Sequence, residues 1–222
     1  GVNMNCAPVL DMPIEGAHQV IGARAFGVEL AGVVALGRAV AEGILAGGLL
    51  PAIKHMPGHG RARSDTHLEL PVVTTAREEL LATDFAPFKA LADLPVAMTA
   101  HVVFEAIDPE QPATTSATVI KEIIRGEIGF GGLLVSDDSS MNALSGSIGD
   151  RVARMTAAGC DLALQWQIRR DAGSRRQLAA ARGRGRTAIC RRLRPPPADG
   201  NIRCLGGSCS ARAGPSGAGM RQ

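Results

Sequence analysis

The residues best suited to chemistry lie close together in the first third of the chain. Residues 54–60 read Lys-His-Met-Pro-Gly-His-Gly, and residues 64–67 read Ser-Asp-Thr-His. Asp65 and His67 are two positions apart, so in a loop the carboxylate reaches the imidazole. A carboxylate that holds one ring nitrogen fixes the tautomer and raises the basicity of the other nitrogen. This pair is therefore a candidate for moving a proton.

The same cluster has two other interpretations. Glycines on both sides of His59 indicate a backbone that turns sharply or approaches a ligand closely. A polar turn with a satisfied histidine is the first alternative. Zinc binding is the second, although the spacing fits no common zinc template; its ligands would be His55, His59, Asp65 and His67.

Asp137 is a second candidate, because it follows an apolar run that ends in Val135 and Ser136. A carboxylate at the end of a buried strand is partly desolvated, so it suits a nucleophile, a metal ligand or an anchor for the next loop. Side chains alternate along a strand, so Asp137 and Asp138 must have different roles. Arg24 lies among small residues and suits binding of sugar hydroxyls or a carboxylate, or a salt bridge.

Strands and helices must alternate to position these groups. Apolar runs predict strands at 2–6, 49–53, 95–100, 132–136 and 160–164. Helical spacing predicts helices at 29–46, from about 75 to 92, and near 149–158, with a stop at Gly47-Gly48. Thr75 and Glu78 have the spacing of a capping box. Ser116 is predicted to cap a further helix whose apolar face contains Val119, Ile120, Ile123 and Ile124.

Alternation of this kind predicts a parallel α/β sheet with right-handed crossovers. Polar residues follow the strand ends, which is the functional face of a (β/α)8 TIM barrel; a doubly wound sheet uses the same edge. Five strands in 166 residues is about 33 residues per unit, whereas a closed barrel needs roughly 250 residues. We therefore expect an incomplete barrel with about five of eight βα units. The polar residues concerned are Asp11, Lys54, His55, His101, Asp137 and Asp138.

Charge divides the chain in two. Residues 1–166 contain 11 Lys and Arg against 19 Asp and Glu, whereas residues 167–222 contain 13 Arg, no Lys and 2 Asp. The second segment is rich in Arg, Gly and Pro without sustained periodicity, so it is predicted to be a disordered tail or the product of a shifted reading frame. Its arginines would suit RNA or an anionic membrane. Because it lacks aromatic stacking platforms, neither nucleic acid nor membrane is expected as a partner.

Bulk properties set broad limits. The chain has 222 residues and is 45% hydrophobic, which suits a globular domain rather than a disordered protein. It has no apolar run of 18 residues and no secretory signal at its start. Five cysteines form no paired pattern, which favours a reducing compartment. A cytoplasmic location is the resulting expectation.

Taken together, the motifs resemble glycoside hydrolase family three, and within it most closely the bacterial β-N-acetylhexosaminidases of peptidoglycan recycling. The resemblance covers residues 1–166, and its segments occur in the family's order. The Lys-His-x-Pro-Gly-His-Gly block followed by Asp-x-His is its most specific part. The matching segments are residues 5–11, 21–27, 54–60, 64–71, 98–102 and 136–141.

The resemblance implies a role for each candidate residue. Asp137 would be the nucleophile, and His67, supported by Asp65, would be the general acid/base. Arg24, Lys54 and His55 would bind N-acetylglucosamine in the first subsite. The reaction implied is two-step, retaining hydrolysis of terminal β-N-acetylglucosamine from muropeptides. Neither a cofactor nor a metal is implied.

This sequence also departs from the family's pattern. The family's segment resembling Asp-Gln-Glu-Gly-Gly-Arg, which supplies further sugar contacts, is absent, and about the first two βα units are missing by the barrel count. Thr66 replaces the usual Ser, and Ser139 replaces the usual Leu. An open barrel exposes two sheet edges. We therefore expect weak or no activity from this chain, and a non-catalytic sugar-binding fragment is the alternative function.

Overall fold

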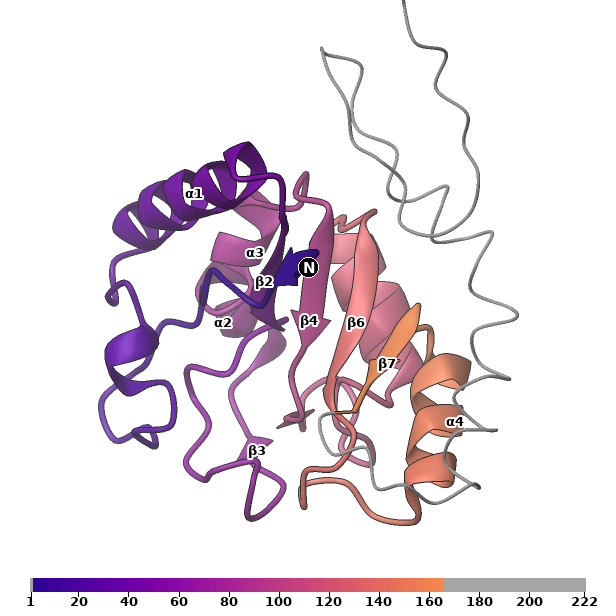
Figure 1. The fold of residues 1–222 in the computed structure, drawn as a ribbon. Coiled ribbons are helices and arrows are strands. Elements are labelled where there is room, and N and C mark those ends of the chain that lie inside the picture. Colours follow the sequence, from indigo (N-terminus) through magenta and orange to yellow (C-terminus); the bar gives the residue numbers. More distant parts are fainter. Residues whose placement is uncertain (1, 166–222) are drawn as a thin grey trace, which may run out of the picture.

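A sheet of five parallel strands, in the order β1-β2-β4-β6-β7, forms the centre of the molecule (Figure 1). The computed structural model describes residues 2–165. A second, two-stranded parallel sheet pairs β3 (Val72–Val73) with β5 (Val103–Phe104). The strands of the main sheet are β1 (Met4–Asn5), β2 (Leu50–Met56), β4 (Val96–Thr99), β6 (Leu133–Asp138) and β7 (Leu162–Leu164).

Helices connect the strands and cover the sheet. In Figure 1, α1 lies beside β2 and α4 beside β7, at opposite ends of the sheet. The predicted incomplete (β/α) barrel is confirmed. None of the helices in residues 2–165 is long and apolar enough to span a membrane. The helices are η1 (Gly22–Arg24), α1 (Leu30–Ala46), α2 (Arg77–Ala82), α3 (Ala86–Ala90), η2 (Val119–Glu127) and α4 (Ile148–Ala158).

Capping explains several helix boundaries. The Ser116 hydroxyl accepts the Val119 N–H at 3.0 Å, so the predicted cap is present. The helix that follows, η2, is a π-helix whose four predicted apolar residues are buried. Ser147 and Asp150 form a capping box at the start of α4, and Gly159 ends that helix with φ 118°. A positive φ is a conformation that glycine adopts without steric cost.

Two predictions about element boundaries need correction. The capping box expected from Thr75 and Glu78 is absent: α2 begins at Arg77, its N-cap is Ala76, and no side chain caps it. Glu78 therefore lies at the second helical position, one residue too early for a box. Both β2 and β6 run further than predicted, so Lys54 and His55 lie within β2 and Asp137 lies within β6. The predicted tail, residues 167–222, lies outside the described residues.

Alternation along the strands divides the core between the two faces of the sheet. On one face, Leu134 and Ala97 pack with the main cluster, which contains buried phenylalanines at 85, 88, 104 and 130. On the other face, Val96, Leu133 and Val135 form a small cluster with Ala52. Half-buried residues of β1 and β7 pack at its margin. Both faces are apolar, as buried parallel strands require.

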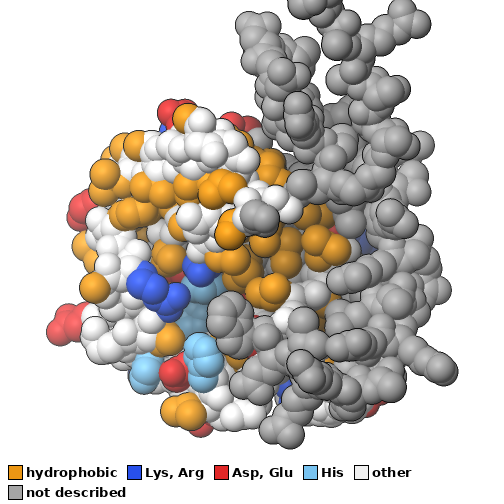
Figure 2. Space-filling view, viewed as in Figure 1, with side chains coloured by type: hydrophobic (Ala, Val, Ile, Leu, Met, Phe, Trp, Pro, Cys, Tyr) orange, Lys and Arg blue, Asp and Glu red, His pale blue; other side chains and the backbone are white. Residues whose placement is uncertain are grey.

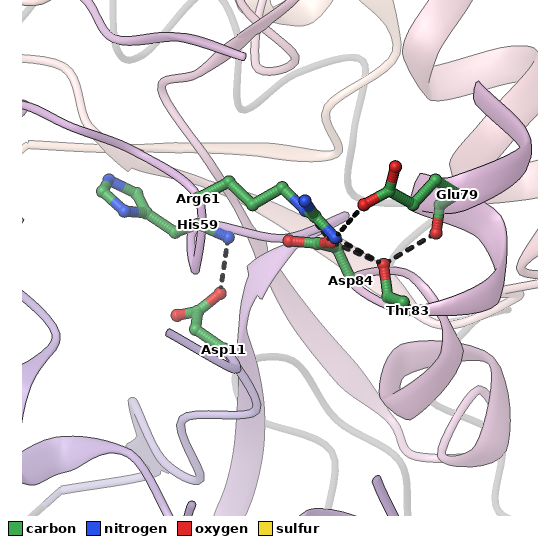
Figure 3. A network of polar contacts seen from close by, with 6 residues as sticks. All are labelled: Asp11, His59, Arg61, Glu79, Thr83 and Asp84. Atoms are coloured by element: carbon green, nitrogen blue, oxygen red, sulfur yellow. Dashed lines mark hydrogen bonds and ion pairs between the residues drawn. The ribbon is translucent and has the colours of Figure 1, made fainter. Parts of the chain in front are cut away.

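The segment 57–62, which follows β2, is held at two points (Figure 3). On one side the Asp11 carboxylate accepts the His59 N–H at 2.7 Å. On the other side Arg61 donates through Nε to Asp84 at 2.6 Å and pairs with Glu79 at 2.9 Å. Because both anchors lie in other parts of the chain, the segment cannot shift without breaking charge-assisted hydrogen bonds.

The two glycines of this segment allow close backbone packing. A Cβ atom at Gly60 would lie 2.0 Å from the Met12 carbonyl oxygen, and one at Gly58 would lie 3.1 Å from the Asp84 Cβ. The Ile14 N–H also donates to the Gly60 carbonyl at 3.2 Å. The close approach expected from the sequence is therefore to the protein's own chain.

Substitution Gly60→Ala should destabilise the protein, because the added methyl group meets backbone rather than a movable side chain. We expect a loss in the free energy of unfolding of about 1–3 kcal/mol or more. Gly43→Ala is the matched control, since its Cβ meets nothing within 4 Å and lies inside α1. It should be neutral or stabilising by up to about 1 kcal/mol. Urea denaturation followed by circular dichroism measures both; equal midpoints would contradict the packing.

Candidate active site

A cleft of about 730 Å³ lies at the carboxyl ends of the parallel strands. Its walls come from β1, β2, β4, β6 and β7 and from two loops. Figure 2 shows histidine, basic and acidic side chains gathered on one part of the surface, beside a hydrophobic area. The lining residues are Cys6, Lys54, His67, Met98, Asp137, Asp138, Ser140, Met141, Asn142 and Leu164. The cleft thus brings together three of the six predicted site residues.

Asp65 and His67 form the predicted pair. The Nδ1 atom of His67 lies 2.8 Å from Oδ1 of Asp65, and the His67 backbone N–H donates to the same oxygen at 2.9 Å. The hydrogen bonds from the backbone and ring of His67 lower the pKa of Asp65, and burial opposes them without prevailing. An ionised carboxylate only accepts, so Nδ1 carries a hydrogen and Nε2 is left to exchange a proton with a ligand. The His67 side chain is 63% exposed.

The loop that carries this pair also touches the loop after β6. The carbonyl of buried Thr66 accepts the Ala143 N–H at 3.2 Å. Because Thr66 lies between Asp65 and His67, the contact ties the pair to the segment that begins at Asp137.

The two adjacent carboxylates at the end of β6 have different surroundings, as the alternation of side chains predicts. Asp137 is buried, and its carboxylate accepts the Asp138 N–H at 2.8 Å. The Asp138 carboxylate instead accepts the backbone N–H and the hydroxyl of Ser140, at 3.0 and 2.5 Å. Asp138 therefore shapes the loop through Ser140, and both aspartates line the cleft.

Lys54 and His55 are neighbours in β2 but face different surroundings. Lys54 lines the cleft. His55 is buried, and its Nδ1 lies 2.7 Å from Oδ2 of Asp11. Asp11 is fully buried, and burial raises its pKa. The charge and hydrogen bonds of His55, together with the charge of His59, lower the pKa by a larger amount, so the net shift is downward. The carboxylate stays ionised and fixes the hydrogen of His55 on Nδ1.

Arg24 lies apart from this group. It ends η1, is exposed, and its guanidinium donates to the Val20 carbonyl at 2.6 Å. Neither Arg24 nor His55 is among the residues that line the cleft. Their predicted contacts with a sugar remain predictions.

The zinc alternative needs His55, His59, Asp65 and His67 to share one ion. The rings of His55 and His59 lie 5.5 Å apart, and His67 pairs with Asp65. Among residues 2–165, no group of three or more His, Cys, Asp or Glu side chains is placed to hold a metal ion.

Two buried histidines lie near Asp137, although the resemblance assigned a role to neither. Burial lowers the pKa of both His59 and His101; the charge of Asp11 is the main opposing effect at His59, and the charge of Asp137 is the main one at His101. Both rings are therefore neutral near pH 7. In the sequence, His101 was indicated by its position beyond a strand and by the matching segment 98–102, and His59 by its glycine-flanked motif and as a candidate zinc ligand.

Comparisons with known proteins agree with this architecture. Residues 1–181 match the model of the glycosyl hydrolase family 3 N terminal domain. A β-hexosaminidase from Alkalilimnicola ehrlichii is 44% identical over 168 residues, which are 74% of this chain and 48% of that protein. The chain thus spans about half the length of the curated relatives it matches.

Solved structures give the same picture. A glycoside hydrolase family 3 β-N-acetylglucosaminidase from Paenibacillus is 32% identical with a TM-score of 0.76, covering 94% of this chain and 43% of that one. NagZ from Neisseria gonorrhoeae, solved with N-trifluoroacetyl-D-glucosamine, is 30% identical with a TM-score of 0.66, covering 86% of this chain and 62% of that one. From its sequence match and its fold, the chain belongs to glycosyl hydrolase family 3, within the part that forms that family's N-terminal domain.

Proposed function

We propose that this chain hydrolyses terminal β-N-acetylglucosamine with retention of configuration, using Asp137 as nucleophile and His67 as general acid/base. The observation that carries the proposal is that Asp137, His67 and Lys54 line one cleft, with Asp65 bound to the ring of His67. The names of the relatives, β-hexosaminidase and β-N-acetylglucosaminidase, support the choice of sugar.

In the first step an Asp137 carboxylate oxygen attacks the anomeric carbon, and the bond from that carbon to the leaving oxygen breaks. The His67 imidazolium gives its Nε2 proton to that leaving oxygen. Asp65 stabilises the imidazolium by accepting from Nδ1 at 2.8 Å. The product is a glycosyl ester of Asp137, in which the carboxylate no longer carries a charge.

In the second step His67, now neutral, takes a proton from water through Nε2, and the water oxygen attacks the anomeric carbon. The ester bond breaks and Asp137 leaves as a carboxylate. Lys54 contributes a donor on the cleft wall that suits a sugar hydroxyl. Muropeptides released from peptidoglycan are the substrate class we propose, and the cytoplasm is the proposed location.

Sugar binding without turnover is the second candidate, and one observation favours it. The described sheet ends at β1 and β7, and the side chain of the proposed acid/base is 63% exposed. Charges in water interact more weakly than charges in a closed site, so an open cleft reduces stabilisation of the transition state. We therefore expect slow hydrolysis compared with ordinary enzymes of this class.

Replacement of the nucleophile tests the mechanism. Asp137→Asn should lower hydrolysis of p-nitrophenyl N-acetyl-β-glucosaminide by about 10³-fold or more, since an amide cannot form the glycosyl ester. Asp93→Asn is the control, because Asp93 pairs with Arg38 on the surface. Turnover by Asp137→Asn at the rate of the unmodified protein would contradict the assignment.

The acid/base role predicts a dependence on the leaving group. His67→Ala should lower kcat/KM by about 10²–10⁴-fold for chitobiose, whose leaving oxygen needs a proton. For the p-nitrophenyl substrate the loss should be smaller, because that leaving group departs without protonation. Asp93→Asn, which removes a surface ion pair with Arg38, again serves as control. Equal losses on the two substrates would show that His67 does not act as the acid.

Calorimetry with N-acetylglucosamine separates the two candidate functions. The catalytic proposal predicts both heat of binding and slow release of sugar from the p-nitrophenyl substrate, with release abolished by Asp137→Asn. Binding with no release above the Asp137→Asn background, measured over hours, would instead establish the sugar-binding function.

A further inference from the structure

His101 is a buried histidine that the proposed chemistry does not use. It follows β4 directly, and none of its surface is exposed. Both of its ring nitrogens have partners: Nδ1 lies 2.8 Å from the Thr114 hydroxyl, and Nε2 lies 3.0 Å from the Asp138 carbonyl oxygen. The ring therefore joins the segment after β5 to the peptide group between Asp138 and Ser139.

The Thr114 hydroxyl continues the connection on its other side. Its oxygen lies 2.8 Å from the Thr99 hydroxyl, and the Thr99 oxygen accepts the Asp137 N–H at 3.4 Å. Thr99 and Thr114 are as fully buried as His101. The chain of contacts thus starts at the N–H of Asp137 and ends at the carbonyl of Asp138.

Counting hydrogens assigns the direction of each contact. A carbonyl only accepts, so Nε2 of His101 must carry a hydrogen. In the neutral ring Nδ1 then accepts from Thr114, which has one hydrogen to give. Thr114 in turn accepts from Thr99, and Thr99 accepts from Asp137. In this arrangement Thr114 gives its one hydrogen to Nδ1 of His101 and not to the Ala100 carbonyl, which also lies 2.8 Å away, and the three side chains each donate in the same direction.

A cationic His101 would reverse the hydrogen bond between its Nδ1 and the Thr114 hydroxyl. Nδ1 would donate to Thr114, whose hydrogen would turn to the Ala100 carbonyl at 2.8 Å. Burial opposes that form and lowers the pKa of His101, with His55 acting in the same direction; Asp137 and Asp138 act against it without prevailing. The neutral arrangement is therefore the one present near pH 7.

Thr114 is itself held in place. The Cys160 thiol donates to the Thr114 carbonyl at 3.5 Å, and burial raises the pKa of that thiol to about 12. Cys160 therefore remains a donor throughout the physiological range and keeps the Thr114 backbone against the start of β7.

We propose that Thr99, Thr114 and neutral His101 form a one-directional hydrogen-bond chain that positions the nucleophile by holding the N–H of Asp137 at one end and the carbonyl of Asp138 at the other. Hydrogen bonds aligned in one direction polarise and strengthen one another. His101 is thus a positioning residue: it holds the backbone and, being neutral, leaves the Asp137 charge available to the substrate. The catalytic consequence rests on the proposed function, whereas the tautomer of His101 does not.

NMR of the full chain labelled with ¹⁵N-histidine tests the tautomer directly, because the protein has five histidines. The signal lost in His101→Gln identifies His101. We expect the neutral Nε2–H tautomer, unchanged between pH 6 and 8. An Nδ1–H tautomer, an imidazolium, or titration of His101 in that range would overturn the proposal.

Variants of Thr114 test the chain and its effect on catalysis. Thr114→Val should shift the His101 Nδ1 resonance toward that of a nitrogen that accepts no hydrogen bond, and Thr114→Ser should restore it. The matched control is Thr115→Val, which removes a neighbouring buried hydroxyl whose partners are Gln111 and Pro112. It should leave the His101 resonances in place.

The loss of kcat in these variants should parallel their effect on the His101 resonances. Thr114→Val should lower kcat by roughly 10- to 100-fold with little change in KM, since misplacement of a reacting group by less than 1 Å is costly. Thr114→Ser and Thr115→Val should keep most of the activity. Equal kcat in Thr114→Val and Thr115→Val would refute a positioning role. If the unmodified chain lacks turnover, the proposed function fails, and the NMR result still decides the hydrogen-bond chain.

Discussion

The arrangement of the site depends on one buried charge, the carboxylate of Asp11. It accepts hydrogen bonds from the backbone and ring of His55 and from the backbone of His59, so it joins the end of β2 to the segment after it. Removing one partner from a buried charge of this kind typically costs about 3–5 kcal/mol. The position of that segment, which leads into the loop of Asp65 and His67, therefore depends on Asp11 remaining ionised and fully hydrogen-bonded.

Burial then decides which groups of the site carry charge. His59 and His101 are buried and stay neutral, because desolvation outweighs the attraction of nearby carboxylates, chiefly Asp11 for His59 and Asp137 for His101. His67 is exposed and has a carboxylate partner on Nδ1, so its Nε2 is open to a ligand. In the proposed mechanism, neutral rings near Asp137 leave its charge to the substrate, whereas a cationic histidine at the same place would form an ion pair with it.

Much of this could be read from the sequence, because the relevant signals are local. Alternating apolar runs predicted the five parallel strands, and a spacing of two residues predicted the Asp65–His67 contact. Features that depend on contacts between residues far apart in the sequence were not predicted. The strands β3 and β5 are two residues each, too short to give a pattern. The need for Gly60 comes from Met12, and the chain through His101 joins side chains of two segments to the backbone of a third. No local spacing encodes such contacts.

The position of the candidate site within the sheet explains how most of its residues fit into a chain that spans about half the length of its relatives. Neighbouring parallel strands end at the same edge, so residues that follow β2, β4 and β6 meet there with only one crossover between each pair. Closure of a barrel has a separate effect, because it excludes water and so strengthens the electrostatic interactions in the cleft. Assembly of the reacting groups is therefore local to the central strands, whereas the electrostatic strength of the site depends on what covers β1 and β7.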